Sequence, residues 1–288
     1  MRRFLSILLL LPVLLIQHAW AGDARTGTFL FSDWDGPPLT VHFVEPDGTA
    51  DRDAPVVIVL HGVGRNADDY AANWQDIVEQ YGFRVYAPEF TRDDFPGADY
   101  YNLGGIGTDG PYAFTALEPL FAAVRGRGGE ATGYYLFGHS AGAQVVHRAL
   151  LFEDLDHLEL AIAANAGWYT MPDTEAAWPY GLARTEADET DLQAWFGKPL
   201  MILLGGSDTD PRDRNLRRSK EALEQGPHRF ARGEAFIRAA QAKAAELGVP
   251  FIWRGSSVPG VAHDNAGMAK GAAPIIAAHA RLREGDGE

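Results

Sequence analysis

Short apolar segments alternate with longer amphipathic ones along most of the chain. The apolar segments have the length and the β-branched and aromatic content of strands. We expect eight of them, at residues 28–31, 39–44, 56–60, 84–87, 134–137, 160–164, 200–204 and 251–256. Helical patterns occupy the intervals, at residues 67–81, 112–124, 141–152, 233–247 and 269–282. This alternation predicts the α/β class: an eight-stranded, mostly parallel sheet with helices on both faces.

The pattern within the strands predicts their direction. Residues 56–60 and 200–204 are continuously apolar, as strands buried on both faces of a parallel sheet are. Residues 39–44 read Leu-Thr-Val-His-Phe-Val, and this alternation is typical of an outer antiparallel strand. We therefore expect the sheet to be antiparallel at its start.

Two connections are longer than ordinary loops, at residues 168–198 and 209–230. Connections of this length in an α/β domain commonly form lids or walls around a site. We expect short cap insertions there. No interdomain linker is evident elsewhere, so residues 22–288 are predicted to form one domain.

The N-terminal residues have the features of an export signal. Two arginines precede an almost wholly apolar run at residues 4–16, and an Ala-Trp-Ala sequence ends at Ala21. A membrane anchor is the alternative, but a spanning helix needs about 20 apolar residues. The prediction is a signal peptide at residues 1–21, a secreted or periplasmic bacterial protein, and no stable membrane insertion after cleavage.

Composition narrows the possible chemistry. The 288 residues include 39 acidic and 25 basic side chains, for a formal net charge of −14, and no cysteine. An acidic protein lacks the basic surface that nucleic acid requires, so we expect no nucleic-acid partner. Without cysteine, disulfides, thiolate metal sites and a cysteine nucleophile are excluded.

One pentapeptide indicates a nucleophile. Gly138-His139-Ser140-Ala141-Gly142 lies between the predicted strand 134–137 and the predicted helix 141–152. Gly-x-Ser-x-Gly in this context forms a sharp turn that exposes the serine hydroxyl at a helix N-terminus, where the helix dipole favours negative charge. The chain has 32 glycines, so the pentapeptide alone carries less weight than its context. Ser140 is the candidate nucleophile.

A serine nucleophile needs a base, and the base needs an acid to orient it. Of nine histidines, His263 follows the last predicted strand, at the sheet edge where ligands gather in α/β folds. The candidate acid is Asp208, directly after strand 200–204 and a Gly-Gly turn, with Asp210 as the alternative. A calcium cage of Asp208, Asp210 and Asp213 is disfavoured, because Arg212 occupies a position where a calcium loop requires Asp or Asn. We predict no metal site.

Backbone amides are expected to stabilise the oxyanion. One is that of Ala141, directly after the serine, and the other is that of Val63, in the loop after strand 56–60. The alternative for the His61-Gly62 pair in this loop is an ordinary strand-ending turn.

Four further residues are candidate substrate contacts. His61 and His139 flank glycines near the predicted site, and Trp168 and Tyr169 follow strand 160–164 at the same edge. The two aromatic rings are expected either to line a pocket for the acyl group or to pack over the hydrophobic core. The arginine run at residues 212–218 would bind a carboxylate or phosphate, or instead form a solvated surface.

Taken together, these motifs resemble those of the α/β-hydrolase superfamily. The elbow at Ser140, the chain order Ser140, Asp208, His263, and the Gly-Gly-Ser-Asp and Pro-Gly-x-x-His turns are most similar to secreted esterases of the polyhydroxybutyrate depolymerase and feruloyl esterase group. Such esterases often carry cysteines, which this chain lacks.

The resemblance implies a serine hydrolase that cleaves a small-molecule or polymeric carboxylic ester through an acyl-enzyme, without a cofactor. A serine peptidase of the same fold and a catalytically silent binding protein are the alternatives.

Overall fold

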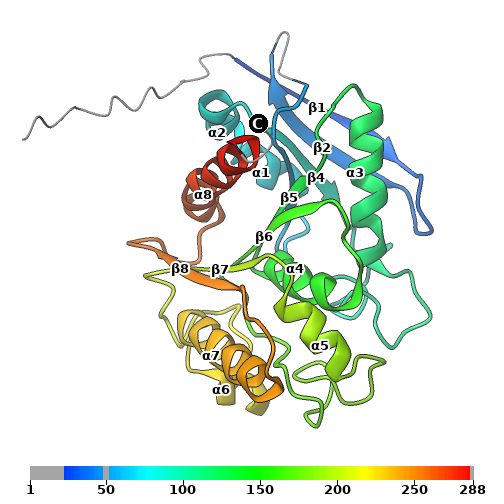
Figure 1. Ribbon diagram of the computed structural model, residues 1–288. Helices are drawn as coiled ribbons and strands as arrows, with labels where there is room; N and C mark the ends of the chain where they lie inside the picture. Colours follow the sequence, from blue (N-terminus) through cyan, green and yellow to red (C-terminus); the bar gives the residue numbers. More distant parts are fainter. Residues whose placement is uncertain (1–22, 48–51, 286–288) are drawn as a thin grey trace, which may run out of the picture.

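One twisted sheet runs through the molecule from β1 to β8 (Figure 1). The computed structural model describes residues 23–47 and 52–285, so the predicted signal peptide lies outside the described residues. In the described part the strands number eight, in the order β1-β2-β4-β3-β5-β6-β7-β8. They are β1 (Ala24–Phe31), β2 (Leu39–Pro46), β3 (Val56–Leu60), β4 (Arg84–Glu89), β5 (Tyr134–His139), β6 (Leu158–Ala164), β7 (Leu200–Gly205) and β8 (Arg254–Val258).

The strand directions confirm the sequence prediction. β2 pairs antiparallel with both β1 and β4, and the other five pairings of the sheet as described are parallel. All five residues of β3 are buried, as its continuous apolar run requires between two helical layers.

Helices cover both faces of the sheet. They are α1 (Ala67–Ala72), α2 (Gln75–Tyr81), α3 (Leu117–Gly126), α4 (Ala141–Phe152), α5 (Glu189–Phe196), α6 (Lys220–Gln225), α7 (Arg229–Leu247) and α8 (Asn265–Gly285), with a 3₁₀ turn η1 at Ala113–Ala116. In Figure 1, α1, α2 and α8 lie on one side of the sheet, and α3, α4 and α5 lie on the other. Buried side chains of α1, α2 and α8 belong to one hydrophobic core, and those of α3, α4, α5 and α7 belong to a second. In the described part of the chain, no helix combines the length and apolarity needed to cross a membrane.

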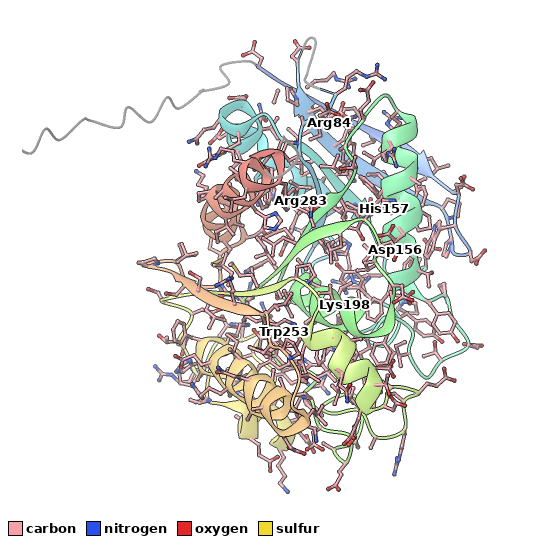
Figure 2. All side chains as sticks on the ribbon, viewed as in Figure 1. Arg84, Asp156, His157, Lys198, Trp253 and Arg283 are labelled. Carbon is pink, nitrogen blue, oxygen red and sulfur yellow. The ribbon has the colours of Figure 1, made fainter. Side chains whose placement is uncertain are left out.

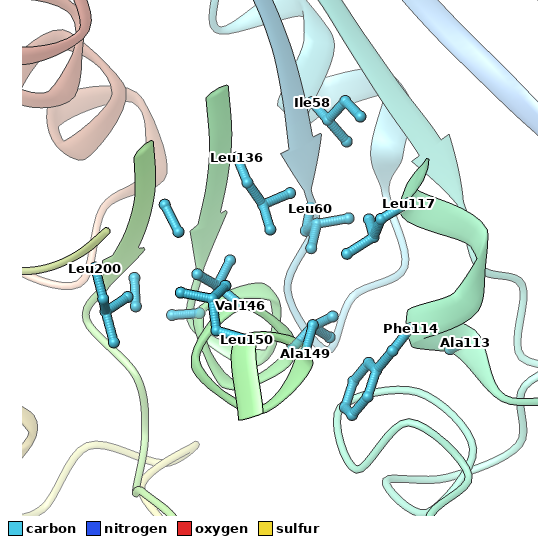
Figure 3. Packing of buried hydrophobic residues seen from close by; sticks show 14 of the residues in the cluster. Ile58, Leu60, Ala113, Phe114, Leu117, Leu136, Val146, Ala149, Leu150 and Leu200 are labelled. Carbon is cyan, nitrogen blue, oxygen red and sulfur yellow. The ribbon is translucent and has the colours of Figure 1, made fainter. Parts of the chain in front are cut away.

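The core under α4 fixes the position of the residue just before this helix. Figure 3 shows Leu60 and Leu136 of the sheet facing Val146 and Leu150 of α4. All four side chains are buried. Each contributes roughly 1.5–3 kcal/mol by leaving water, so the start of α4 is held firmly against the ends of β3 and β5.

Two predicted helical segments are not single α-helices, and two observed helices were not predicted. The helix predicted at residues 67–81 is divided between α1 and α2 at Trp74, which is fully buried and donates its backbone N–H to Ala71. The helix predicted at 112–124 begins as the 3₁₀ turn η1. The α5 and α6 helices, each about two turns or shorter, lie inside the two long connections and were not predicted.

The last strand lies at residues 254–258 rather than 251–256. The apolar residues 251–253 precede the strand, and Trp253 (Figure 2) packs there beside α5 and α7, with its indole N–H donating to the Trp195 carbonyl. β8 is an edge strand whose first four residues are exposed, so its sequence carries no hydrophobic signal.

Candidate active site

Ser140 occupies a strained turn between β5 and α4. Its backbone has φ 59° and ψ −112°, outside the regions that residues other than glycine ordinarily adopt. A Cβ on Gly138 would lie 2.3 Å from the Gly142 carbonyl oxygen, and one on Gly142 would lie 2.1 Å from that of Leu60. Both positions therefore require glycine, and the turn raises the serine above the ends of β3 and β5.

The Ser140 hydroxyl belongs to a chain of hydrogen-bonded side chains. His263 Nε2 lies 3.1 Å from Ser140 Oγ, and His263 Nδ1 lies 2.8 Å from Asp208 Oδ2. When Nδ1–H donates to the carboxylate, Nε2 presents its lone pair to the hydroxyl. The three side chains come from the ends of β5, β7 and β8, which the parallel sheet brings to one edge.

Asp208 is buried and held by an arginine as well as by the histidine. Arg229 Nη1 lies 3.2 Å from Asp208 Oδ1, and Arg229 Nη2 lies 2.9 Å from Asp213 Oδ1. Burial alone would raise the pKa of Asp213, but the hydrogen bonds from Arg229 and from the Asn215 backbone N–H, together with the nearby positive charge, lower this pKa overall.

The neighbouring carboxylates make different contacts from those of Asp208. Asp210 accepts a hydrogen bond from the Arg212 backbone N–H at 2.9 Å and caps a turn, so the hydrogen-bond partner of His263 is Asp208. The guanidinium of Arg229 hydrogen-bonds both Asp208 and Asp213.

Asn165 holds the loops that carry the acid and the base. Its backbone is left-handed, with φ 51°, at the end of β6. Its Oδ1 accepts a hydrogen bond from the Gly205 N–H, and its Nδ2 donates to the Ala262 carbonyl at 3.0 Å. This bridge between the β7 and β8 loops was not predicted, because only the tertiary contact reveals it.

The loop after β3 lies against the nucleophile. A Cβ on Gly62 would lie 3.6 Å from Ser140 Cβ and 2.7 Å from the Tyr70 hydroxyl. Arg92 donates to the Val63 carbonyl at 2.6 Å, which anchors the loop from outside. Ala141 is the first residue of α4, so its amide has no acceptor within the helix. The loop that carries Val63 and the first residue of α4 thus both lie beside Ser140.

A cavity of about 490 Å³ opens over Ser140 and His263. Its predicted lining residues include His139 and Trp168, and Arg214 and Arg217 come from the long connection at 209–230, as expected of a site wall. The other long connection contributes Trp168 alone to this lining.

Two predicted substrate contacts do not reach this cavity. His61 is fully buried, its Nδ1 lies 3.1 Å from the Gly62 carbonyl oxygen and its Nε2 accepts the Phe90 N–H at 3.0 Å. Burial is the main reason that the pKa of His61 falls to about 3. Tyr169 is also fully buried and stacks on Phe236 at 4.5 Å. Both were predicted wrongly, because their positions beside the site in sequence do not determine the direction of their side chains.

His139 lies directly under the candidate base. Its ring centroid is 4.6 Å from that of His263, and its Nδ1 lies 3.0 Å from the Tyr70 hydroxyl. Burial first, and then the nearby charges of His263 and Arg229, hold the pKa of His139 well below its usual range. His139 therefore supplies a neutral ring against which the His263 imidazole packs.

Several polar lining residues were not predicted, among them Tyr70 and Gln144. No motif marks Tyr70. Gln144 did have a signal, since it lies four residues after Ser140 and a helix places such residues on one face.

No family model and no curated protein sequence matches the chain. Among solved structures, poly(aspartic acid) hydrolase-1 from Sphingomonas sp. KT-1 is 40% identical, covers 88% of this chain and 99% of that chain, and has a TM-score of 0.84.

Two other structures extend this comparison. LpqC, a poly(3-hydroxybutyrate) depolymerase from Bordetella parapertussis, is 34% identical, covers 88% of this chain and 89% of that chain, and has a TM-score of 0.82. FphF, a fluorophosphonate-binding serine hydrolase from Staphylococcus aureus, is 14% identical with a TM-score of 0.59, covers 90% of this chain and 99% of that chain, and shares the fold alone. By its fold and by the two relatives above 30% identity, the chain belongs to the α/β-hydrolase superfamily, in the polyhydroxybutyrate depolymerase-like group.

Proposed function

We propose that this hydrolase cleaves carboxylic esters through an acyl-enzyme formed on Ser140. The observation that carries the proposal is the continuous hydrogen-bonded chain from Ser140 through His263 to Asp208. His263 removes the hydroxyl proton as Ser140 attacks the ester carbonyl, and the same imidazole then protonates the leaving alcohol. Asp208 orients the ring and stabilises its protonated form.

The oxyanion of the tetrahedral intermediate is stabilised by the amides of Val63 and Ala141. Both belong to backbone segments that flank Ser140, one before α1 and one at the start of α4, where the helix dipole adds to the stabilisation. Water activated by His263 then hydrolyses the acyl-enzyme. Trp168 and His139 are the predicted substrate contacts that line the cavity, and they wall the acyl site.

A fluorophosphonate probe followed by intact-protein mass measurement tests the proposal. The wild-type chain should gain one adduct, and Ser140→Ala should gain none and lose ester turnover by several orders of magnitude. Ser256→Ala, a change of an exposed serine on the edge strand β8, is the matched control and should label normally. An unlabelled wild type would favour a silent binding protein, and labelling retained in Ser140→Ala would refute the nucleophile.

A second candidate function is hydrolysis of amide bonds in an anionic polymer. In the described part of the chain, the cavity lining includes three arginines, Arg214, Arg217 and Arg229, and neither Asp nor Glu. Arg214 and Arg217 are exposed, although the whole chain carries a charge of −14. The relative from Sphingomonas is named for its hydrolysis of poly(aspartic acid), an anionic chain.

Matched p-nitrophenyl ester and p-nitroanilide substrates, together with poly(aspartic acid) and poly(3-hydroxybutyrate), separate these two functions. Ester and polyester cleavage without anilide cleavage supports the first proposal. Cleavage of poly(aspartic acid) that falls in Arg214→Gln supports the second, because removal of the cation weakens binding of an anionic chain.

We further propose that the chain is exported and cleaved after Ala21. The support is the basic, apolar and small-residue order of residues 1–21. The mature protein, isolated from a periplasmic or medium fraction and sequenced from its N-terminus, should begin at Gly22. A protein that stays in the membrane fraction with residues 1–21 intact would refute the export proposal.

A further inference from the structure

Gln144 lies on the cavity side of α4, one helical turn after the nucleophile. The four-residue separation sets it about 6 Å from Ser140 along the helix axis, on the same helix face. Gln144 lines the active-site cavity, yet its exposed fraction is only 5%. A buried amide at such a position must have its polar atoms satisfied, or must reserve them for a ligand.

The hydrogen bonds around Gln144 settle the direction of its carboxamide. Its Oε1 accepts from Asn102 Nδ2 at 3.0 Å and from Arg148 Nη1 at 3.2 Å. Neither donor can bond a carboxamide nitrogen, because Nε2 is itself a donor. The –NH₂ group is therefore the end that is turned away from Asn102 and Arg148.

The Gln144 nitrogen has no acceptor within the described part of the chain. Some polar atoms in this part of the chain, such as Arg148 Nη2, are fully buried and have no hydrogen-bond partner. Gln144 Nε2 is not one of them, so it remains accessible from the cavity. The residue beside it is Gly167: a Cβ there would lie 3.3 Å from Gln144 Nε2 and would begin to cover it.

The support behind Gln144 is rigid. Arg148 is fully buried and donates to Thr170 Oγ1 and to the Asn102 carbonyl, each at 2.8 Å, and its guanidinium lies 4.3 Å from the Trp168 ring centroid. No carboxylate pairs with Arg148 among the described residues. A buried, unpaired cation is costly, and here it holds one carboxamide in one orientation.

We propose that Gln144 Nε2 is a specificity-determining donor that binds a second carbonyl oxygen of the substrate. The preferred substrate class is then an oligomer in which every repeat unit carries a carbonyl, with the bound carbonyl one unit away from the scissile bond. This inference rests on the proposed function, because it takes Ser140 as the position of the scissile carbonyl.

Two matched substrate pairs test it, one for each side of the scissile bond. On the acyl side, the p-nitrophenyl ester of monomethyl succinate is compared with p-nitrophenyl hexanoate, which has the same chain length and no second carbonyl. On the alcohol side, the butyrate of methyl β-hydroxybutyrate is compared with sec-hexyl butyrate by titration of released acid. In the wild type, kcat/KM should favour the carbonyl-bearing member of at least one pair by roughly 10-fold.

The informative variant is Gln144→Glu. Its carboxylate still accepts from Asn102 and Arg148, so the fold is preserved, but the atom facing the cavity becomes an acceptor instead of a donor. The preference for the carbonyl-bearing substrate should disappear, while fluorophosphonate labelling of Ser140 persists. Gln193→Glu, the same change at an exposed position on α5, should keep the wild-type preference.

The outcomes separate the two proposals. A wild type that neither labels nor turns over any ester overturns the proposed function and this inference with it. Normal labelling, with no preference in the wild type or with the same preference in Gln144→Glu, overturns the role of Gln144 alone. A preference lost only in Gln144→Glu supports that role, and the affected pair shows on which side of the scissile bond Gln144 acts.

Discussion

Acidification should destabilise this protein through histidines that the fold keeps neutral. His61, His139 and His147 are almost wholly buried, and burial is the largest cause of the lowered pKa of each. The pKa of His61 falls to about 3, and those of the other two fall well below their usual range.

The hydrogen bonds of two of these histidines explain why they resist protonation. In His61 and His147, Nδ1–H donates to a backbone carbonyl, of Gly62 and Ala143 respectively, and Nε2 accepts a backbone N–H. Protonation of Nε2 would place two donors against each other and bury a charge. Both costs favour the neutral ring in the folded state.

The sign and size of the effect follow from linkage. A histidine in the unfolded chain has a pKa near 6.5, so below this pH the unfolded state binds protons that the folded state does not. The stability is fully present above pH 6.5 and is lost as the pH falls toward the folded pKa. Each such histidine lowers the free energy of unfolding by about 1.4 kcal/mol for every pH unit of acidification below pH 6. The three together lower it by about 4 kcal/mol per pH unit. That is a large part of a typical stability of about 5–15 kcal/mol.

Urea unfolding monitored by tryptophan fluorescence between pH 8 and pH 5.5 measures this slope. Above pH 5.5 the carboxylates of the unfolded chain remain largely ionised, so histidines dominate the proton uptake. The slope in His147→Gln should be smaller than in the wild type by about one third. A wild-type slope below about 1.4 kcal/mol per unit, or an unchanged slope in the variant, would refute the claim that these histidines stay neutral in the folded protein.

Three further predictions concern the turn and the carboxylate pair. Gly142→Ala should destabilise the fold by about 3 kcal/mol or more in urea unfolding, because its Cβ would lie 2.1 Å from the Leu60 oxygen; wild-type stability would contradict the proposed fit. Asp208→Asn should lower kcat for p-nitrophenyl butyrate by roughly 10³–10⁴-fold while Asp210→Asn changes it little, and equal losses would refute the assignment of Asp208. Arg229→Gln should cost about 3–5 kcal/mol of stability, since it leaves buried carboxylate charge uncompensated, and a loss below about 1 kcal/mol would argue against this ion pair.

The elements that could be predicted are those whose signal is local. The strand at 56–60 and the helix at 141–152 were predicted with the observed bounds, because a strand buried between two helical layers requires an unbroken apolar run and the helix follows directly on the Gly-x-Ser-x-Gly turn. Edge strand β8 could not be placed correctly, since an exposed strand needs no apolar residues and its position is set by pairing with β7. The α5 helix begins at a capping box formed by Asp188 and Asp191 and buries Leu192, Trp195 and Phe196.

The site divides in the same way. Neighbours in sequence determine the turn at Ser140, because its two glycines, the strand before it and the helix after it lie within one short segment. The selection of Asp208 over Asp210 depends on a hydrogen bond that spans 55 positions of the chain. The sequence indicated both carboxylates as candidates, but it does not determine which of their side chains points toward His263.

By itself, the sequence determined the class of fold, the order of the candidate catalytic residues and the sharp turn that exposes Ser140, since all of these depend on short-range pattern and backbone sterics. Only the tertiary structure decided that His61 is sealed in the core, that Arg229 lies between two carboxylates and that Gln144 directs its nitrogen into the cavity. The reason is that a polar side chain is oriented by the partners that satisfy it in the folded state, and those partners come from segments far apart along the chain.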